Sequence, residues 1–270
     1  MKRIVVVLIN YYKEEKLAAF VMELLLPQKG VDLRIIVVDN GSSLNDPLKQ
    51  LQQHGVAVLY PEKNLGYFGA ARLAWETESA QHGLPDYFVV SNFDLSFDPE
   101  HFFADYMLAE SKQTALVSGP SIISDLNGTA LNPMYLQRIS LSRINRLLLV
   151  TSFYPFFWIY QLLHYIKRNI KGKQQQELHG DVQSYAIHGS MMFFTRHYFQ
   201  RGGHLKFDSF LYGEELFVAE QLHQMGEKCL VHLDMKVKHE EHSTTGKIKG
   251  PGHMKFLNQS LRYLKRVFFQ

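Results

Sequence analysis

The stretch YFVVSNFDLSF, residues 87–97, decides the fold of this chain. Its first four residues are apolar and rich in strand formers, which predicts a buried strand over 87–90. The sequence then turns polar at Asn92 and Asp94. Ligands of open α/β sheets bind at the carboxyl ends of the strands, so a carboxylate there is placed to hold a divalent cation that binds a diphosphate. The alternative is a plain turn, with Asn92 bonded to its own backbone.

Composition limits the class of protein. The 270 residues allow one large domain or two small ones, and 46% hydrophobic with 20% charged residues excludes a disordered chain. A net charge of +3 is too small to indicate nucleic acid binding, but it is compatible with an anionic ligand or a membrane surface. The single Cys229 excludes a disulfide framework and fits a reducing cytosol. The charged and apolar start resembles a signal peptide, but its apolar run is short and no cleavage site follows, so it predicts a first strand.

Strands and helices alternate through the first half. The apolar pattern predicts strands at 3–9, 33–38, 56–60 and 87–90, with helices at 14–26, 47–54, 70–82 and 98–110 and a further strand at 115–123. This alternation favours a mostly parallel α/β sheet flanked by helices. Three of the strands end on polar residues, namely Asn10, Asp39 and the Asn92–Asp94 pair. Core packing does not require polar residues at that edge, whereas a nucleotide site does.

The segment NLGYFGAA, residues 64–71, runs into the third helix. Gly66 and Gly69 would let backbone amides approach an anion at the helix N-terminus. Such a glycine pair is also common in simple turns.

The second half contains a different kind of segment. Residues 129–182 carry scattered Lys and Arg around an apolar core at 147–166, which Pro155 interrupts. This core is too short and broken for a transmembrane helix. Trp158 and the flanking basic residues fit a segment at a membrane interface, and a buried helical pair fits equally well. Residues 254–270 form a basic amphipathic helix.

Polar residues recur towards the C-terminus. A strand is expected over 185–196 with Gly189 and Ser190 at its centre, and the adjacent Glu214 and Glu215 precede a helix at 216–225. These acids either serve a site or simply complement the helix dipole. Short strands follow at 229–232 and 235–238. Two histidines, His239 and His242, could then ligate a metal, contact phosphate or lie on the surface.

Seven pieces in order carry a family resemblance: the strand ending at Asn10–Tyr11, VVDNGSS (37–43), NLGYFGAA (64–71), NFD (92–94), HGSMMFF (188–194), FLYGEE (210–215) and HEEHSTTG (239–246). Together they resemble inverting family 2 glycosyltransferases of the GT-A fold, especially bacterial rhamnosyltransferase-like enzymes that build surface polysaccharides. The resemblance implies a single GT-A domain over 1–270, with a donor-binding half at 1–125, a helical, interfacial insertion at 126–182 and an acceptor-binding, catalytic half at 183–270.

The resemblance also implies roles for individual residues. Asp39 would contact the base and ribose of the donor, and Asp94 would bind the metal with help from His239. Glu215 would be the catalytic base, with Glu214 beside it. Asn92 replaces the first acid of the usual metal motif, and Arg72 stands where relatives often carry Asn. The other donor-binding residues would be Asn10, Tyr11, Asn40, Asn64, Gly66 and Gly69, and the acceptor would meet His188, Gly189 and Ser190.

The implied reaction is a single displacement at the anomeric carbon. It needs a base for the acceptor hydroxyl and a cation, Mg²⁺ or Mn²⁺, on the departing diphosphate. The donor would be a UDP- or dTDP-linked sugar, and the acceptor a saccharide or a lipid-linked molecule. The expected location is the cytoplasm, with a possible peripheral site on the inner face of the plasma membrane. Two alternatives stay open: a nucleotidyltransferase, and a non-catalytic binding subunit of the same fold.

Overall fold

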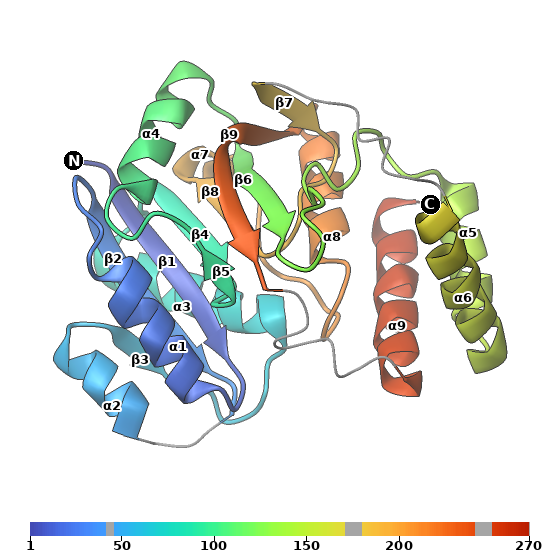
Figure 1. The fold of residues 1–270 in the computed structure, drawn as a ribbon, viewed down its shortest axis with the longest axis horizontal. Coiled ribbons are helices and arrows are strands. Elements are labelled where there is room, and N and C mark those ends of the chain that lie inside the picture. Colours follow the sequence, from blue (N-terminus) through green and yellow to red (C-terminus); the bar gives the residue numbers. More distant parts are fainter. Residues whose placement is uncertain (42–45, 171–179, 241–249, 270) are drawn as a thin grey trace.

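The computed structural model describes residues 1–41, 46–170, 180–240 and 250–269 (Figure 1). Its elements in chain order are β1 (Arg3–Asn10), α1 (Glu14–Phe20), η1 (Val21–Leu25), β2 (Asp32–Asp39), α2 (Asp46–Gln53), β3 (Ala57–Leu59), α3 (Tyr67–His82), β4 (Tyr87–Ser91), β5 (Leu95–Ser96), α4 (Phe102–Lys112), β6 (Val117–Ser124), α5 (Leu141–Val150), α6 (Tyr154–Ile170), β7 (Asp181–Ser184), β8 (Met191–Thr195), α7 (Arg196–Gln200), α8 (Glu214–Gln224), β9 (Cys229–His239) and α9 (Pro251–Phe268).

One sheet runs through the described part of the chain, in the order β3-β2-β1-β4-β8-β6-β9-β5, with β7 paired to β9. Strands β3, β2, β1 and β4 are mutually parallel, as the alternating pattern predicts. Strand β8 runs antiparallel to both β4 and β6. Asn10 and Asp39 are register partners, so the polar ends of β1 and β2 meet at one edge of the sheet.

The apolar strands build a core on each face of the sheet. Residues 4–8 of β1 are completely buried and alternate between the two cores, as expected for a strand covered on both sides. Helices α3 and α8 contribute Phe68 and Phe217 to one core, while α1 and α4 contribute Leu17 and Phe103 to the other. Each such buried side chain stabilises the fold by about 2 kcal/mol.

Two details of the elements differ from the sequence prediction. The helix expected over 14–26 widens into a π-helical turn at η1, where the amide of Leu26 donates to the carbonyl of Val21, five residues earlier, at 2.9 Å. The two short strands expected after residue 229 form one strand, β9.

The single strand expected over 185–196 is wrong. Strand β7 ends at Ser184 and β8 begins only at Met191. The residues between them turn instead, because Asn132 Oδ1 accepts the amide of His188 at 2.6 Å and the Ser190 carbonyl accepts the amide of Asn92 at 2.7 Å. The turn brings 188–190 to the same edge as the ends of β1 and β4.

Helices α5, α6 and α9 stand to one side of the sheet. Figure 1 shows α9 between the body of the molecule and the pair α5–α6. Arg138, just before α5, ties this group to α8 through a bidentate pair with the buried Glu220, at 2.9 and 2.7 Å, and donates to the Phe268 carbonyl at 3.2 Å. In the described ranges, no helix is both long and apolar enough to cross a membrane.

Candidate active site

A buried hydrogen bond joins the carboxyl ends of β1 and β2. Asn10 Nδ2 donates to Asp39 Oδ1 at 2.9 Å, and that same oxygen accepts the Gly41 amide at 3.1 Å. Both side chains are completely buried. The structure therefore places Asn10 and Asp39 underneath the candidate site, and neither lines the cavity described below.

The loop before α3 is positioned by Asn40. Its Nδ2 donates to the Gly66 carbonyl at 3.0 Å, and its Oδ1 accepts the Leu65 amide at 3.2 Å. Gly66 has φ +74°, and a Cβ built on it would lie 2.1 Å from the carbonyl oxygen of Phe210. Only glycine fits there, because the backbone of the segment before α8 crosses directly over it.

Asp94 and His239 form a buried pair at the end of the sheet. Antiparallel pairing sets Leu95 of β5 opposite His239 of β9, and the Glu240 amide donates to the Asp94 carbonyl at 2.9 Å. This brings Asp94 Oδ1 to 3.3 Å from His239 Nε2, with side chains only 4% and 11% exposed. The His188 ring lies 5.5 Å from that of His239, centre to centre.

The Asp94–His239 pair has donors suited to a divalent cation, one carboxylate and one imidazole. Among the residues that the structure describes, no group of three His, Cys, Asp or Glu could hold a metal by itself. Magnesium-type sites commonly combine one or two protein ligands with substrate phosphates and water, so the two residues fit a site that a diphosphate completes. His242 lies outside the described residues.

The two glutamates begin α8 in different surroundings. Glu214 is 6% exposed, and burial together with the charge of Glu215 raises its pKa from 4.5 to about 8. Glu215 is partly exposed, and burial also raises its pKa, opposed by a backbone hydrogen bond from Gly189. A Cβ on Gly189 would lie 2.7 Å from Glu215 Oε1. Gly189 thus lets the Glu215 carboxylate rest against the backbone of the 188–190 turn.

These groups share one cavity of about 550 Å³. It is lined by Ile9, Tyr11, Asn40, Asn64, Gly66, Tyr67, Asn92, Phe93, Asp94, His188, Gly189, Ser190, Phe210, Leu211, Tyr212, Glu214, Glu215, His239 and Phe256. Most of the residues predicted from sequence are in this set, although they come from seven separate segments of the chain.

Two further predicted donor residues are not brought to the cavity. Arg72 lies on the surface of α3, where its Nε donates to Glu76 Oε1, one turn further on, at 2.7 Å. Gly69 lies inside the first turn of α3, against Leu65. Arg72 is five residues past Tyr67, where the helix begins, so its side chain lies along the helix surface and does not reach the loop.

The sequence analysis missed the aromatic wall of the cavity. Tyr67 donates from its hydroxyl to the Gly189 carbonyl at 3.3 Å, and its pKa is raised well above its usual value by burial and by Glu214. Tyr212 has φ +69°, and its buried hydroxyl has no hydrogen-bond partner within the described residues. Phe210 packs on Phe256 of α9, with ring centres 5.2 Å apart. Two of these aromatic residues could have been found from the sequence, because Tyr67 and Tyr212 lie inside the NLGYFGAA and FLYGEE segments that carry the family resemblance.

The sequence profile described as glycosyl transferase family 2 matches residues 6–202, most of the chain and most of the cavity. The chain belongs to glycosyl transferase family 2. No curated protein sequence matches this family 2 glycosyltransferase significantly.

Solved structures agree on the fold. The family 2 glycosyltransferase described here is similar to GalNAc-T7 in complex with UDP, GalNAc and Mn²⁺, with a TM-score of 0.57 and 15% identity over 98% of this chain and 48% of that one. It is also similar to the mannosyltransferase PcManGT of Pyrobaculum calidifontis, in complex with GDP-Man and Mn²⁺, with a TM-score of 0.51 and 13% identity over 91% of this chain and 59% of that one. The chain thus spans about half the length of these proteins. The GT-A fold expected from the sequence is confirmed.

Proposed function

We propose that this glycosyltransferase transfers a sugar, with inversion, from a UDP- or dTDP-linked donor to a saccharide or lipid-linked acceptor during synthesis of a bacterial surface polysaccharide. The observation that carries the proposal is that two pairs of polar residues line one cavity, Asp94–His239 and Glu214–Glu215. One pair suits the departing diphosphate, and the other suits the attacking hydroxyl. Rhamnosyl transfer in particular is inferred from the family resemblance alone.

Glu215 is proposed as the base. It takes the proton of the acceptor hydroxyl while that oxygen attacks the anomeric carbon and the bonding electrons of the sugar–diphosphate bond leave with the nucleotide. With a pKa of about 8, Glu214 is largely protonated at pH 7, so the charge of the pair resides on Glu215. The Gly189 backbone hydrogen bond supports this assignment, because it stabilises the ionised form of Glu215.

Asp94 and His239 are proposed to hold Mg²⁺ or Mn²⁺. The bound cation would supply positive charge to the diphosphate as it leaves. The manganese in both compared structures supports this choice. His188 and Ser190, joined through Nδ1 and Oγ at 3.0 Å, are proposed to face the acceptor together with the hydroxyl of Tyr212. Asn92, Tyr11, Asn40 and Asn64 remain the proposed donor contacts.

Asp39 is given a modified role. Because it is completely buried and bonded to the Gly41 amide, we propose that it fixes the backbone beneath the donor and that Asn10 fixes Asp39. The proposed halves of the domain, 1–125 and 183–270, then supply the donor and acceptor sides of the cavity, with 126–182 as the insertion.

A peripheral membrane contact is part of the proposal, with the enzyme acting in the cytoplasm at the inner face of the plasma membrane. Helix α6 supports it, because Phe156, Trp158 and Leu163 are 52%, 55% and 60% exposed. Exposed aromatic and aliphatic side chains in such number are characteristic of interaction surfaces.

Calorimetric titration with UDP and dTDP, with and without MnCl₂, tests the proposal. Wild-type protein is expected to bind one of them in a manganese-dependent manner, and Asp94→Ala to lose that binding while keeping its thermal unfolding transition. Asp105→Ala is the matched control, since Asp105 is exposed on α4. Unchanged binding by Asp94→Ala would remove Asp94 from the metal site. Manganese-dependent hydrolysis of the matching nucleotide sugars then separates the transferase from a non-catalytic subunit, which would bind without turnover.

A further inference from the structure

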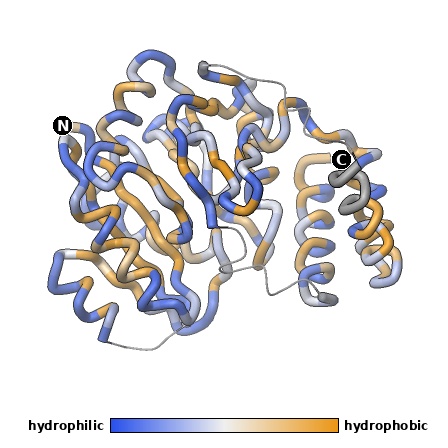
Figure 2. Tube along the Cα trace, viewed as in Figure 1, coloured by the Kyte–Doolittle hydropathy of each residue, from blue (hydrophilic) through white to orange (hydrophobic). Residues whose placement is uncertain are grey.

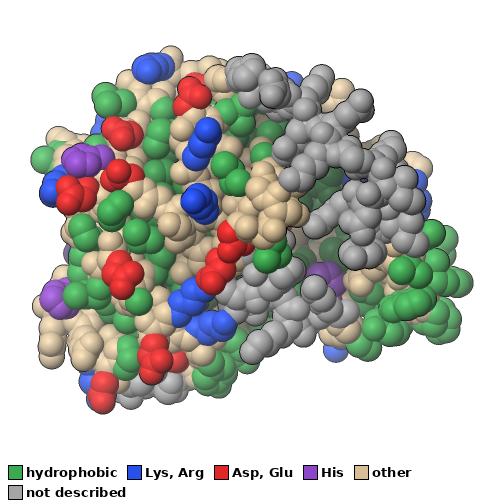
Figure 3. Space-filling view, in the orientation of Figure 1, with side chains coloured by type: hydrophobic (Ala, Val, Ile, Leu, Met, Phe, Trp, Pro, Cys, Tyr) green, Lys and Arg blue, Asp and Glu red, His purple; other side chains and the backbone are tan. Residues whose placement is uncertain are grey.

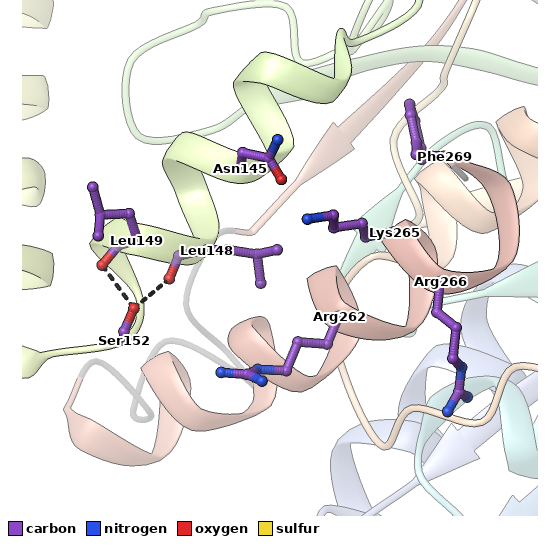
Figure 4. A pocket seen from close by; sticks show the side chains of 8 residues that line it. All are labelled: Asn145, Leu148, Leu149, Ser152, Arg262, Lys265, Arg266 and Phe269. Carbon is purple, nitrogen blue, oxygen red and sulfur yellow. Dashed lines mark hydrogen bonds between the residues drawn. The ribbon is translucent and has the colours of Figure 1, made fainter.

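A second cavity, about 690 Å³ in volume, lies between α5 and α9, away from the residues that line the catalytic cavity. We call it the basic groove, and it is lined by Asn145, Leu148, Leu149, Ser152, Arg262, Lys265, Arg266 and Phe269. Figure 4 shows Arg262 and Lys265 reaching from α9 towards α5, while Arg266 projects from the rim. The α5 side contributes Leu148 and Leu149, together with the uncharged polar residues Asn145 and Ser152. The groove thus offers cationic groups beside hydrocarbon.

The helices around the groove carry basic residues but no acidic ones. Helices α5, α6 and α9 contain no Asp or Glu, although the chain has 26 acidic residues. Their basic residues are Arg143, Arg146, Lys167, Arg168, Lys255, Arg262, Lys265 and Arg266. The net charge of the whole chain is only +3, but the charged residues of these three helices are all basic. Basic helices of this kind attract an anionic surface over about a Debye length.

The groove opens beside exposed apolar side chains. Leu149 lines the groove and is 66% exposed, and Phe153, the last residue before α6, is 57% exposed. Figure 2 shows hydrophobic residues on these outer helices, and Figure 3 shows their side chains gathered at the edge of the molecule over α5 and α6. We call this set the α6 face; its other members are Tyr154, Phe156, Trp158, Ile159, Leu162 and Leu163.

We propose that the basic groove binds the phosphate headgroup of an anionic phospholipid while the α6 face enters the interface of the same bilayer. This rests on the membrane contact proposed above and adds the binding site and the lipid class. Cationic side chains beside exposed aromatic residues match the headgroup and acyl layers of a membrane surface. A second copy of the chain fits less well, because a two-fold contact would bring the same basic surface against itself.

The lipid site and the catalytic cavity share α9. Phe256 lines the catalytic cavity, and the groove residues follow two to three turns later on the same helix. His253 contacts Tyr212 on the cavity side and Phe157 of α6 on the other, with ring centres 4.4 and 5.7 Å apart. A helix of 18 residues is about 27 Å long, so an enzyme held at the groove keeps its cavity within that distance of the headgroups. This favours the lipid-linked acceptor over a free saccharide.

Vesicle sedimentation tests the site with two double variants of equal charge change. Arg262→Gln/Lys265→Gln removes two of the three groove cations, the two that reach towards α5, and Lys2→Gln/Lys112→Gln removes two exposed cations elsewhere. The vesicles are phosphatidylcholine with or without phosphatidylglycerol, at low salt. The groove variant is expected to lose about 30-fold in partitioning to the anionic vesicles, since each basic residue near the surface is worth about 1 kcal/mol. The control variant should change by less than about threefold.

Trp158 gives a second measurement. The chain has two tryptophans, and Trp75 is partly buried and stacks on Phe199, so Trp75→Phe leaves Trp158 as the reporter on the α6 face. Its fluorescence should shift to the blue with anionic vesicles and stay unchanged with neutral ones.

Each of the following results would contradict a specific part of this proposal. If wild-type protein does not bind anionic vesicles, the membrane contact and the groove site both fail. Equal losses in the two double variants would show that net charge alone acts, and the groove site fails while membrane contact stands. Concentration-dependent dimerisation without vesicle binding would assign the α6 face to self-association. Nucleotide binding, measured in parallel, reports on the proposed transferase independently of all three results.

Discussion

Replacing each of the paired glutamates by glutamine should separate their roles. Glu215→Gln keeps size and hydrogen bonding but removes the base, so turnover should fall by about 10²- to 10⁴-fold, the usual worth of general base catalysis. That loss corresponds to about 3–5 kcal/mol of barrier. Donor affinity should hardly change, because Glu215 is not among the residues proposed to bind the donor. Glu214→Gln should retain turnover within about tenfold.

The structure also predicts how stability depends on pH. The pKa of Glu214 rises from 4.5 in the unfolded chain to about 8 in the native protein, mainly because the side chain is buried. Between these values the unfolded state has released a proton that the native state still holds, so stability falls as pH rises through this window. The slope within this window is about 1.4 kcal/mol per pH unit. Glu214→Gln should remove this decline and unfold at a higher temperature than wild type at pH 8.

Steady-state kinetics and thermal unfolding at pH 5 to 9 check both statements on the same two variants. Calorimetry with the donor nucleotide confirms that each variant still binds. The assignment is refuted if Glu214→Gln loses turnover and Glu215→Gln keeps it. The burial argument is refuted if Glu214→Gln and wild type lose stability in parallel between pH 5 and 8.

Two further predictions concern the fold. Gly66→Ala should be destabilised by several kcal/mol more than Gly55→Ala in urea unfolding, because both have positive φ but only Gly66 faces a backbone oxygen, that of Phe210, at 2.1 Å; similar losses would contradict the close approach. The buried His232, whose pKa is raised by its carboxylate partners, including Glu110 at 3.0 Å, should stabilise the fold fully below pH 6.5 and progressively less as pH rises through its native pKa. A pH titration of its ring chemical shifts by NMR should give a native pKa above 6.5, and a value below 6.5 would show that desolvation dominates.

The sequence predicted the outline of the site because the relevant signal is local. Apolar runs that end on Asn10, Asp39 and Asp94 mark the ends of buried strands, and parallel pairing brings the carboxyl ends of neighbouring strands together. How deeply each of these side chains is buried, however, does not depend on the local sequence. Asp39 is covered because Asn10 and the Gly41 amide surround it, and that depends on the exact register of β1 and β2.

The turn at 188–190 shows the same limit. Its apolar flanks favour a continuous strand, and the turn exists because Asn132 and Asn92, both distant in sequence, bond to its backbone. The aromatic wall was missed for a related reason, since Phe256 reaches the cavity only through the packing of α9. Arg72 was predicted to contact the donor, with a helix expected to begin only at residue 70. Helix α3 begins at Tyr67, and hydrophobic periodicity does not determine such a boundary.

The pairing of β5 with β9 has a consequence for how the enzyme is made. Asp94 is synthesised long before His239, and the two meet only when the C-terminal part of the chain has folded onto the sheet. Contacts so distant along the chain carry a large loop-closure cost and form late in folding. A nascent or truncated chain can therefore have β1, β2 and β4 in place and still lack half of the Asp94–His239 pair. Given the proposed role of this pair in binding the cation, unfinished copies would not yet polarise the diphosphate and would not consume activated sugar.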